Sequence, residues 1–152
     1  MKKGTALFIG RFQPFHRGHA HAVRMLLKEY KRVIIAVGCG NRDSRNPFSF
    51  QERKEIIEAT LGKRGRYKII GIRDYKSDRR WYGEIMKRAK FDVVVTGNAH
   101  VARCFRQSDV IEPPFLDRKK YSSTAVRSGI RSGRWKSLVD AKAAKIIGGH
   151  YA

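Results

Sequence analysis

The sequence has few cysteines, few acidic residues and no long apolar run, and each shortage excludes a class of protein. Its 152 residues include two cysteines, Cys39 and Cys104, which are too few for a disulfide scaffold and form no pattern of metal ligands. No apolar run approaches the roughly 20 residues that a membrane helix needs. The apolar run after residues 1–4 is shorter than a secretory signal core, so we expect a cytoplasmic protein with no membrane segment.

The shortage of acidic residues leaves a large positive charge. There are 34 lysines and arginines against 13 aspartates and glutamates, a formal net charge of +21. Between Arg118 and Lys145 there is a single acid, Asp140, among many basic residues. Such a charge favours anionic partners and steers them by its long-range field. Nucleic acid, an anionic membrane and a polyphosphate substrate all fit this charge, and nonspecific nucleic-acid binding through phosphates stays open.

Composition and length indicate a globular protein. The hydrophobic fraction is 41% and the charged fraction is 31%, values of a chain that folds rather than one that stays disordered. A length of 152 residues suits one domain, and we expect a single domain over 1–152 with a small basic helical portion at about 121–152.

Apolar segments alternate with segments of helical periodicity along the chain. The pattern predicts strands at 6–9, 33–37, 67–72, 92–96 and 110–111. It predicts helices at 18–30, from a cap at Ser49 to 61, at 80–90, 101–105, from Ser122 or Ser123 to about 132, and at 135–147. Because the strands are apolar throughout, we expect an α/β fold: a doubly wound, Rossmann-like parallel sheet of about five strands. Ligands bind beyond the carboxyl ends of such strands.

The segment from Gly10 to His19 follows the first predicted strand and carries the first set of chemical groups. His16 and His19 are three residues apart at the start of the predicted helix, where backbone N–H groups favour phosphate. Gly18 lets the backbone pass close to a ligand, and Arg11 adds a permanent cation. Taken alone, the two histidines can equally be capping or surface residues. They can also ligate a metal, but no third ligand stands nearby, so we expect no metal site built from protein groups.

The same ten residues, Gly-Arg-Phe-Gln-Pro-Phe-His-Arg-Gly-His, resemble the opening motif of the HxGH nucleotidyltransferase superfamily. Within it they are similar to the archaeal-type nicotinamide mononucleotide adenylyltransferases. The resemblance implies that His16 and His19 act on the ATP α-phosphate and that Arg11 holds the β,γ end. It places four further residues of the motif at the nucleotide: Gly10, Phe12, Gln13 and Gly18.

A second string lies far along the chain, at Tyr121-Ser122-Ser123-Thr124-Ala125-Val126-Arg127. By themselves these residues predict a capped basic surface helix, because serine and threonine are ordinary caps. The string is similar to the second signature of the superfamily, Ser-Ser/Gly-Thr-x-x-Arg. The resemblance assigns the helix start and Arg127 to the β- and γ-phosphates. It makes four residues nucleotide contacts: Tyr121, Ser122, Ser123 and Thr124.

Residues 45–53 resemble a stretch of the archaeal family in which Arg45 would be a mobile cation over the triphosphate. Glu52 and Arg53, in the same stretch, are expected to be structural, with Glu52 completing a capping box. The resemblance further assigns Gly97 and Asn98, which follow the fourth strand, to nucleotide contacts.

The acceptor site rests on two residues after the third strand. By resemblance, Trp81 stacks on a nicotinamide ring, although a tryptophan in a helix is more often part of a core. The family typically has asparagine where this chain has Asp78, which still suits the amide NH₂ but not its carbonyl. This departure leaves the acceptor open.

The expected reaction is attack of a mononucleotide phosphate on the α-phosphorus of ATP, with release of pyrophosphate. The acceptor is nicotinamide mononucleotide or, alternatively, another phosphate such as a phosphopantetheine, FMN or a polyol phosphate. Magnesium is expected on the substrate phosphates. A third hypothesis is a nucleic-acid-binding protein on this scaffold. Family members are often oligomers, so a homo-oligomer is possible.

Overall fold

The structure is a computed structural model that describes all 152 residues, and it contains two compact units. The sheet unit comprises Met1–Gly10, Arg24–Gly40 and Arg66–Pro114. The helical unit comprises Arg11–Val23, Asn41–Gly65 and Phe115–Ala152. No helix combines the length and the apolar character needed to cross a membrane. The predicted single domain over 1–152 would require the two units to form one body, and it stays a prediction.

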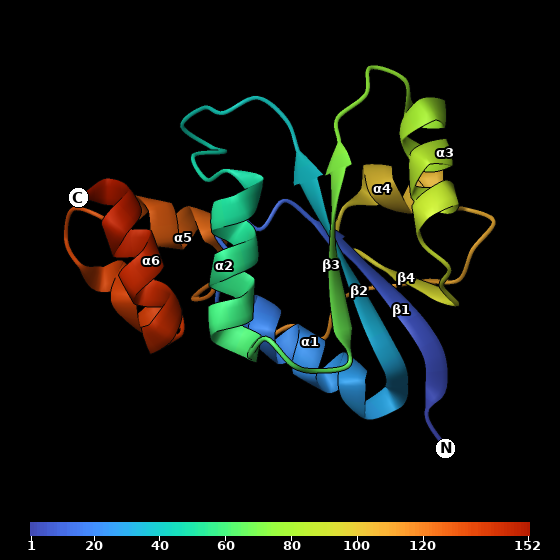
Figure 1. Cartoon of the computed structure of the whole chain (residues 1–152), viewed down its shortest axis with the longest axis horizontal. Helices are drawn as coiled ribbons and strands as arrows, with labels where there is room; N and C mark the ends of the chain where they lie inside the picture. The colour runs from blue at the N-terminus through green and yellow to red at the C-terminus, as the bar shows by residue number, and fades with distance from the viewer. The chain divides into compact units, whose positions relative to one another are not determined.

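The sheet unit contains five parallel strands (Figure 1). They are β1 (Lys3–Gly10), β2 (Tyr30–Cys39), β3 (Tyr67–Arg73), β4 (Val93–Val95) and β5 (Val110–Ile111), in the order β3-β2-β1-β4-β5. Strand addition reverses direction between β1 and β4, which is the switch point of a doubly wound sheet. The predicted Rossmann-like parallel sheet of about five strands is therefore confirmed.

Apolar side chains explain why these segments form a sheet. The three valines of β4 are buried, and the central residues of β1 and β2 are almost all buried. Two helices of this unit, α3 (Asp78–Arg88) and α4 (Ala99–Cys104), follow β3 and β4. Ile85 of α3 and Phe105 at the end of α4 pack into the same apolar core as Leu7 and Val94 of the sheet. This core fixes the starts of α3 and α4 beyond the ends of their strands.

The helical unit contains the first turns of α1 (Arg17–Glu29), then α2 (Phe50–Leu61), α5 (Ser123–Ser128), the 3-10 helix η1 (Arg134–Leu138) and α6 (Ala141–Tyr151). Helix α6 packs beside α2 (Figure 1). Ser49 caps α2: its hydroxyl accepts from the N–H of Glu52, and the Glu52 side chain accepts from the N–H of Ser49. The predicted capping box is confirmed.

Two predicted helix boundaries near the C-terminus are wrong. The helix expected to run to about residue 132 ends at Ser128, because Gly129 terminates it and the chain folds back to bury Trp135. The helix expected from 135 to 147 is two elements, η1 and α6. Val139 between them is extended and buried, and Asp140 then caps α6 by accepting from the N–H of Lys142.

Candidate active site

The two motif histidines are stacked at the start of α1. Their ring centroids are 3.7 Å apart, with an angle of 29° between the planes. Nδ1 of His16 accepts from the N–H of Gly18 at 3.0 Å, and Nδ1 of His19 accepts from the N–H of His16 at 3.2 Å. Because Nδ1 is the acceptor in each neutral ring, the proton sits on Nε2. Each imidazole therefore carries its N–H at Nε2.

Burial keeps both rings neutral. It lowers the pKa of His16 from 6.5 to about 4. Burial also lowers the pKa of His19 well below its usual value, and the neighbouring His16 lowers it further. Near neutral pH the motif thus presents two neutral hydrogen-bond donors, which is a donor pair suited to a phosphoryl oxygen.

The residues around the histidines leave them little freedom. A Cβ at Gly18 would lie 2.8 Å from Cε1 of His16 and 3.1 Å from Cβ of Tyr121, so this position has no room for a side chain. The Phe12 side chain is buried, and its backbone adopts the left-handed conformation with φ 52°. This conformation is uncommon for a bulky residue. Its ring meets that of His19 edge-on at 4.8 Å. Close packing thus fixes the orientation of the imidazoles.

Buried polar side chains hold the loop that precedes α1. The side-chain amide of Gln13 forms two hydrogen bonds with the backbone of Phe48. Nε2 donates to the carbonyl of Phe48 at 3.0 Å, and Oε1 accepts from the N–H of Phe48 at 2.9 Å. Arg53 donates from Nη1 to the carbonyl of Arg11 at 2.7 Å and from Nε to the carbonyl of Ser49. Gln13 and Arg53 are 4% and 3% exposed, so these bonds are shielded from water. Gln13 was predicted to contact the nucleotide, and its side-chain amide forms hydrogen bonds within the protein.

The second predicted signature lies against the first. The Ser123 hydroxyl donates to the carbonyl of Pro14 at 2.9 Å, and Nη1 of Arg127 donates to the carbonyl of Gln13 at 2.7 Å. Nη2 of Arg127 reaches the Thr124 hydroxyl at 3.5 Å. The two strings are more than a hundred residues apart in sequence, and these bonds join them directly. Since a guanidinium carries five N–H donors, Arg127 keeps donors for a phosphate.

The other residues of the second signature sit at the start of α5. The Ser122 hydroxyl accepts from the N–H of Ala125 at 3.0 Å, so Ser122 rather than Ser123 is the helix cap. Thr124 is exposed, and Tyr121 is half-buried beside the position of Gly18. This end of α5 therefore combines a capped helix start with exposed hydroxyl and cationic groups.

Arg45 and Arg11 are the exposed cations of the predicted site. The carboxylate of Asp43 accepts from the N–H of Arg45 at 2.9 Å and from the N–H of Asn46 at 2.8 Å, forming a tight turn that presents Arg45 at its surface. Hydrogen bonds from Asn46, followed by one from Arg45, lower the pKa of the Asp43 carboxyl. Both arginines belong to the helical unit, as do the histidines and the second signature.

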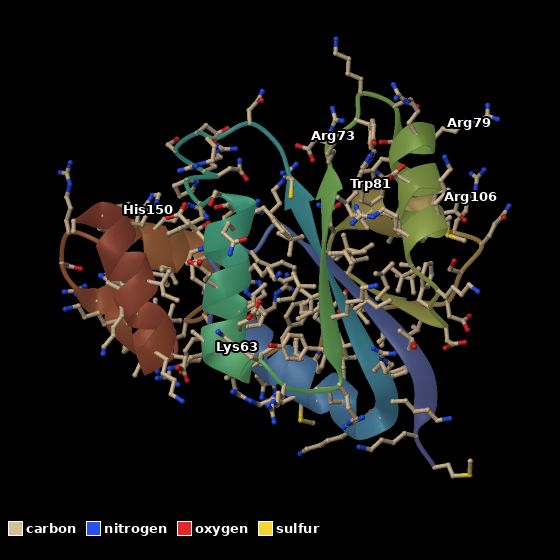
Figure 2. The ribbon with its side chains drawn as sticks, viewed as in Figure 1. Lys63, Arg73, Arg79, Trp81, Arg106 and His150 are labelled. Carbon is tan, nitrogen blue, oxygen red and sulfur yellow. The ribbon has the colours of Figure 1, made fainter.

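Five predicted residues belong to the sheet unit: Gly10, Asp78, Trp81, Gly97 and Asn98. Gly10 ends β1, and Asn98 caps α4 by accepting from the N–H groups of His100 and Val101. Trp81 on α3 is half-buried and meets Phe105 edge-on at 5.8 Å (Figure 2). Asp78 accepts a hydrogen bond from Nε2 of His100 at 3.0 Å if the ring carries its proton there. Trp81 thus contributes to the core, and Asp78 already has a partner.

His150, near the end of α6, is a neighbour of this region that the sequence analysis missed (Figure 2). Its Nδ1 lies 2.6 Å from Oε2 of Glu52, and its ring lies 4.6 Å from that of Phe48. Burial raises the pKa of Glu52, but hydrogen bonds from Ser49 and His150 outweigh it and lower the pKa overall. No local pattern pairs residues 98 positions apart, although a histidine close to the end of an amphipathic helix was the available signal.

Residues 7–129 match the cytidylyltransferase-like family, which is most of the chain. The chain belongs to the cytidylyltransferase-like family. The predicted membership of the HxGH nucleotidyltransferases, and hence the prediction of an enzyme of this class, is confirmed.

Curated relatives with the name nicotinamide-nucleotide adenylyltransferase are similar over nearly the whole chain. The protein from Pyrobaculum neutrophilum is 38% identical, across 93% of this chain and 86% of the relative. The protein from Pyrococcus furiosus is 36% identical, across 97% of this chain and 83% of the relative. The archaeal-type resemblance that the motifs suggested therefore extends well beyond the motifs.

A solved structure shares the fold. It is a bifunctional NMN adenylyltransferase/ADP ribose pyrophosphatase from Francisella tularensis, in complex with AMP and a manganese ion. The TM-score is 0.73 at 28% sequence identity, across 93% of this chain. This chain spans 44% of that bifunctional protein, which is less than half of its length.

Proposed function

We propose that this protein is a nicotinamide-nucleotide adenylyltransferase that transfers AMP from ATP to the phosphate of nicotinamide mononucleotide, giving NAD and pyrophosphate. The observation that carries the proposal is the direct bonding of the two signatures, through Ser123 to Pro14 and Arg127 to Gln13. These bonds support a single site that combines the histidine pair and the start of α5. The relatives that share this activity in their names cover most of the chain.

The chemistry needs no nucleophile from the protein. An acceptor phosphate is already anionic near neutral pH, so it attacks the α-phosphorus in line while pyrophosphate leaves. Catalysis then consists of positioning and charge stabilisation. Nε2–H of His16 and of His19 donates to oxygens of the α-phosphate, and these bonds strengthen as negative charge builds in the transition state.

Arginines complete the cradle for the leaving pyrophosphate. Arg127 has its guanidinium oriented by Gln13 and Thr124, while Arg11 and Arg45 stand exposed and can close on the β- and γ-phosphates. Tyr121 and Gly18 flank the histidines at the same place. We assign Gly10, Phe12, Gly97 and Asn98 to the nucleotide on the strength of the family resemblance.

Magnesium fits as a companion of the substrate. Two carboxylates of the helical unit already have structural partners, because Asp43 closes a turn and Glu52 completes a capping box. Oxygens of the triphosphate are the hard ligands that Mg²⁺ prefers, and a bound ion would supply charge neutralisation there. The Francisella structure, which holds a manganese ion with AMP, supports a divalent ion in this role.

A panel of acceptors tests the proposal. Pyrophosphate release from ATP is measured with nicotinamide mononucleotide, nicotinate mononucleotide, phosphopantetheine, FMN and a polyol phosphate. We expect release with nicotinamide mononucleotide, together with formation of NAD. If no pyrophosphate is released with either pyridine mononucleotide but some is released with another acceptor, the protein is a nucleotidyltransferase for that other acceptor. Binding of DNA with a steep salt dependence and no turnover with any acceptor would establish the nucleic-acid-binding alternative.

A further inference from the structure

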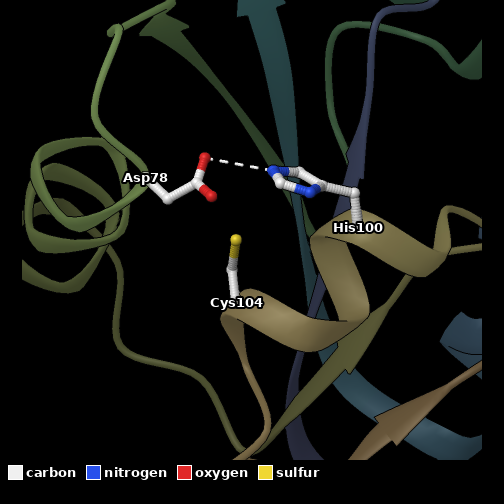
Figure 3. A group of neighbouring side chains, drawn as sticks. All are labelled: Asp78, His100 and Cys104. Carbon is white, nitrogen blue, oxygen red and sulfur yellow. Dashed lines mark hydrogen bonds and ion pairs between the residues drawn. The ribbon is translucent and has the colours of Figure 1, made fainter.

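Three side chains that can ligate a metal converge between α3 and α4, in the sheet unit (Figure 3). Asp78 is the first residue of α3, and His100 and Cys104 lie four residues apart on α4. Side chains four apart on a helix lie on the same face, so His100 and Cys104 point toward the same space. Figure 3 shows Asp78 reaching into that space from the neighbouring helix.

The spacing of these groups is close to that of a tetrahedral centre. One carboxylate oxygen, one imidazole nitrogen and the thiol sulfur all lie within 4.8 Å of one another, and Oδ1 of Asp78 is 3.0 Å from Nε2 of His100. Zinc bonds of about 2.0–2.3 Å place tetrahedral ligands roughly 3.3–3.6 Å apart. Asp78 and His100 are exposed, so small side-chain rotations bring the three atoms to that separation. The hydrogen bond between Asp78 and His100 already brings two ligand atoms together, and a bound ion would replace the shared proton, which is released to solvent.

The ligand types select the ion. A thiolate and an imidazole favour borderline-soft ions such as Zn²⁺, whereas Mg²⁺ and Ca²⁺ take oxygen ligands. Arg79, Arg103 and Arg106 line the same hollow, and they repel cations that are held by charge alone. Asp78 and a Cys104 thiolate supply two negative charges that match a dication. Only an ion that forms strong bonds to nitrogen and sulfur suits this environment.

We propose that Asp78, His100 and Cys104 form a site for a zinc-like divalent transition metal, with the fourth position open to solvent. Such an ion ties the start of α3 to α4. The three ligands belong to the sheet unit and the histidine motif to the helical unit, and the inference does not rest on the proposed transferase activity. No local pattern of metal ligands marks these residues in the sequence, because the third ligand comes from a different helix.

Titration of the full chain with Co²⁺, followed by displacement with Zn²⁺, tests the site. Cobalt bound to a thiolate gives an intense near-ultraviolet charge-transfer band, and tetrahedral coordination intensifies its visible bands. We expect one ion per chain with both signals, displaced by Zn²⁺ and unaffected by excess Mg²⁺. Cys104→Ser should lose the charge-transfer band, and Asp78→Asn and His100→Ala should bind at least roughly 10–100-fold more weakly, the range seen even for groups that only support ligands.

Two matched controls separate this site from adventitious binding. Cys39→Ser removes the other thiol, and His21→Ala removes a histidine of the helical unit; both should bind cobalt as the parent protein does. Circular dichroism confirms that each variant is folded, which is expected because Asp78 and His100 are exposed. The proposal is overturned if the parent protein gives no thiolate band, if the band disappears with Cys39 instead, or if Mg²⁺ displaces the cobalt. It is also overturned if Asp78→Asn and His100→Ala bind as tightly as the parent.

Discussion

At the scale of single residues, backbone amides determine the chemistry of the motif histidines. The N–H groups of Gly18 and His16 occupy Nδ1 of the two rings, which leaves the donor at Nε2 in each. Burial removes the charge that an imidazole would otherwise carry at mildly acidic pH. Under the proposed function the pair therefore serves as hydrogen-bond donors whose direction is set by the protein, and it avoids the repulsion of two stacked cations.

Gly18→Ala should lower turnover without unfolding the protein. The added methyl group would lie 2.8 Å from His16, so the ring must move, while alanine is a better helix former than glycine. Because misplacing a reacting group by about 1 Å can cost 100-fold, we expect kcat to fall on the order of 10–100-fold. Steady-state kinetics and thermal unfolding check this. Unchanged kcat would show that the orientation of His16 does not matter.

The buried state of His16 predicts a loss of stability in acid. Its pKa is about 4 in the folded protein against 6.5 when unfolded, so between these values the unfolded chain binds a proton that the folded chain does not. The free energy of unfolding is therefore unaffected by this group above about pH 6.5. It decreases by roughly 3 kcal/mol as the pH falls toward 4. Urea unfolding of the parent and of His16→Gln, at about pH 7.5 and 4.5, measures it. The parent should lose more stability than the variant; equal losses would refute the assignment.

At the scale of elements, the start of α2 links the fold to the motif loop. The capping box of Ser49 and Glu52 fixes the first turn of α2, and Arg53 in that turn donates to the carbonyl of Arg11. His150 of α6 reaches the same Glu52. The first turn of α2 thus contacts both the loop that carries Arg11 and helix α6, and it connects these two parts of the helical unit.

Ser49→Ala should destabilise the protein by about 1 kcal/mol, with a range of about 0.5–2, because it removes the cap from the N–H of Glu52. Chemical unfolding measures the change. Ser44→Ala, at an exposed loop position nearby, is the control and should be within about 0.5 kcal/mol of the parent. A variant at Ser49 as stable as the control would mean that the capping bond contributes nothing.

Local patterns predicted most elements, and they failed where distant contacts decide. The strands were predictable because a buried parallel sheet requires apolar residues throughout, as in Val93–Val95. The end of α5 at Ser128 was not, because it depends on Trp135 folding back against Gly129, where a Cβ would lie 3.0 Å from the Trp135 nitrogen. Asp140 was the missed local signal, since it caps α6 directly.

The candidate site shows the same division. The resemblance of the motif strings to a family pointed to the histidines and Arg127, whose residue types and spacing alone left their role open, and that role stays a prediction. The structural use of Gln13 and the part played by His150 depend on pairings with Phe48 and Glu52, which no local pattern reveals. The zinc-like site was missed for the same reason, since Asp78 lies on a different helix from its partners.

At the scale of the whole molecule, the net charge of +21 should speed the capture of a polyanionic substrate. Salt screens this attraction, since the Debye length falls from about 10 Å at 0.1 M to about 3 Å at 1 M. We expect kcat/KM for ATP to fall steadily with added salt, while kcat at saturating ATP changes much less. Initial rates over a salt series check this. A value of kcat/KM that is independent of salt would show that the charge serves another partner.

The central claim is that the stacked histidine pair stabilises the transition state at the α-phosphate of ATP. The most direct measurement is the turnover of His19→Ala in NAD formation, with His21→Ala as a control on the same helix and thermal unfolding to confirm that both variants are folded. We predict that kcat of His19→Ala falls on the order of 10²–10³-fold, the loss expected for one transition-state donor, while His21→Ala keeps its activity. Full activity of a folded His19→Ala variant would contradict the mechanism.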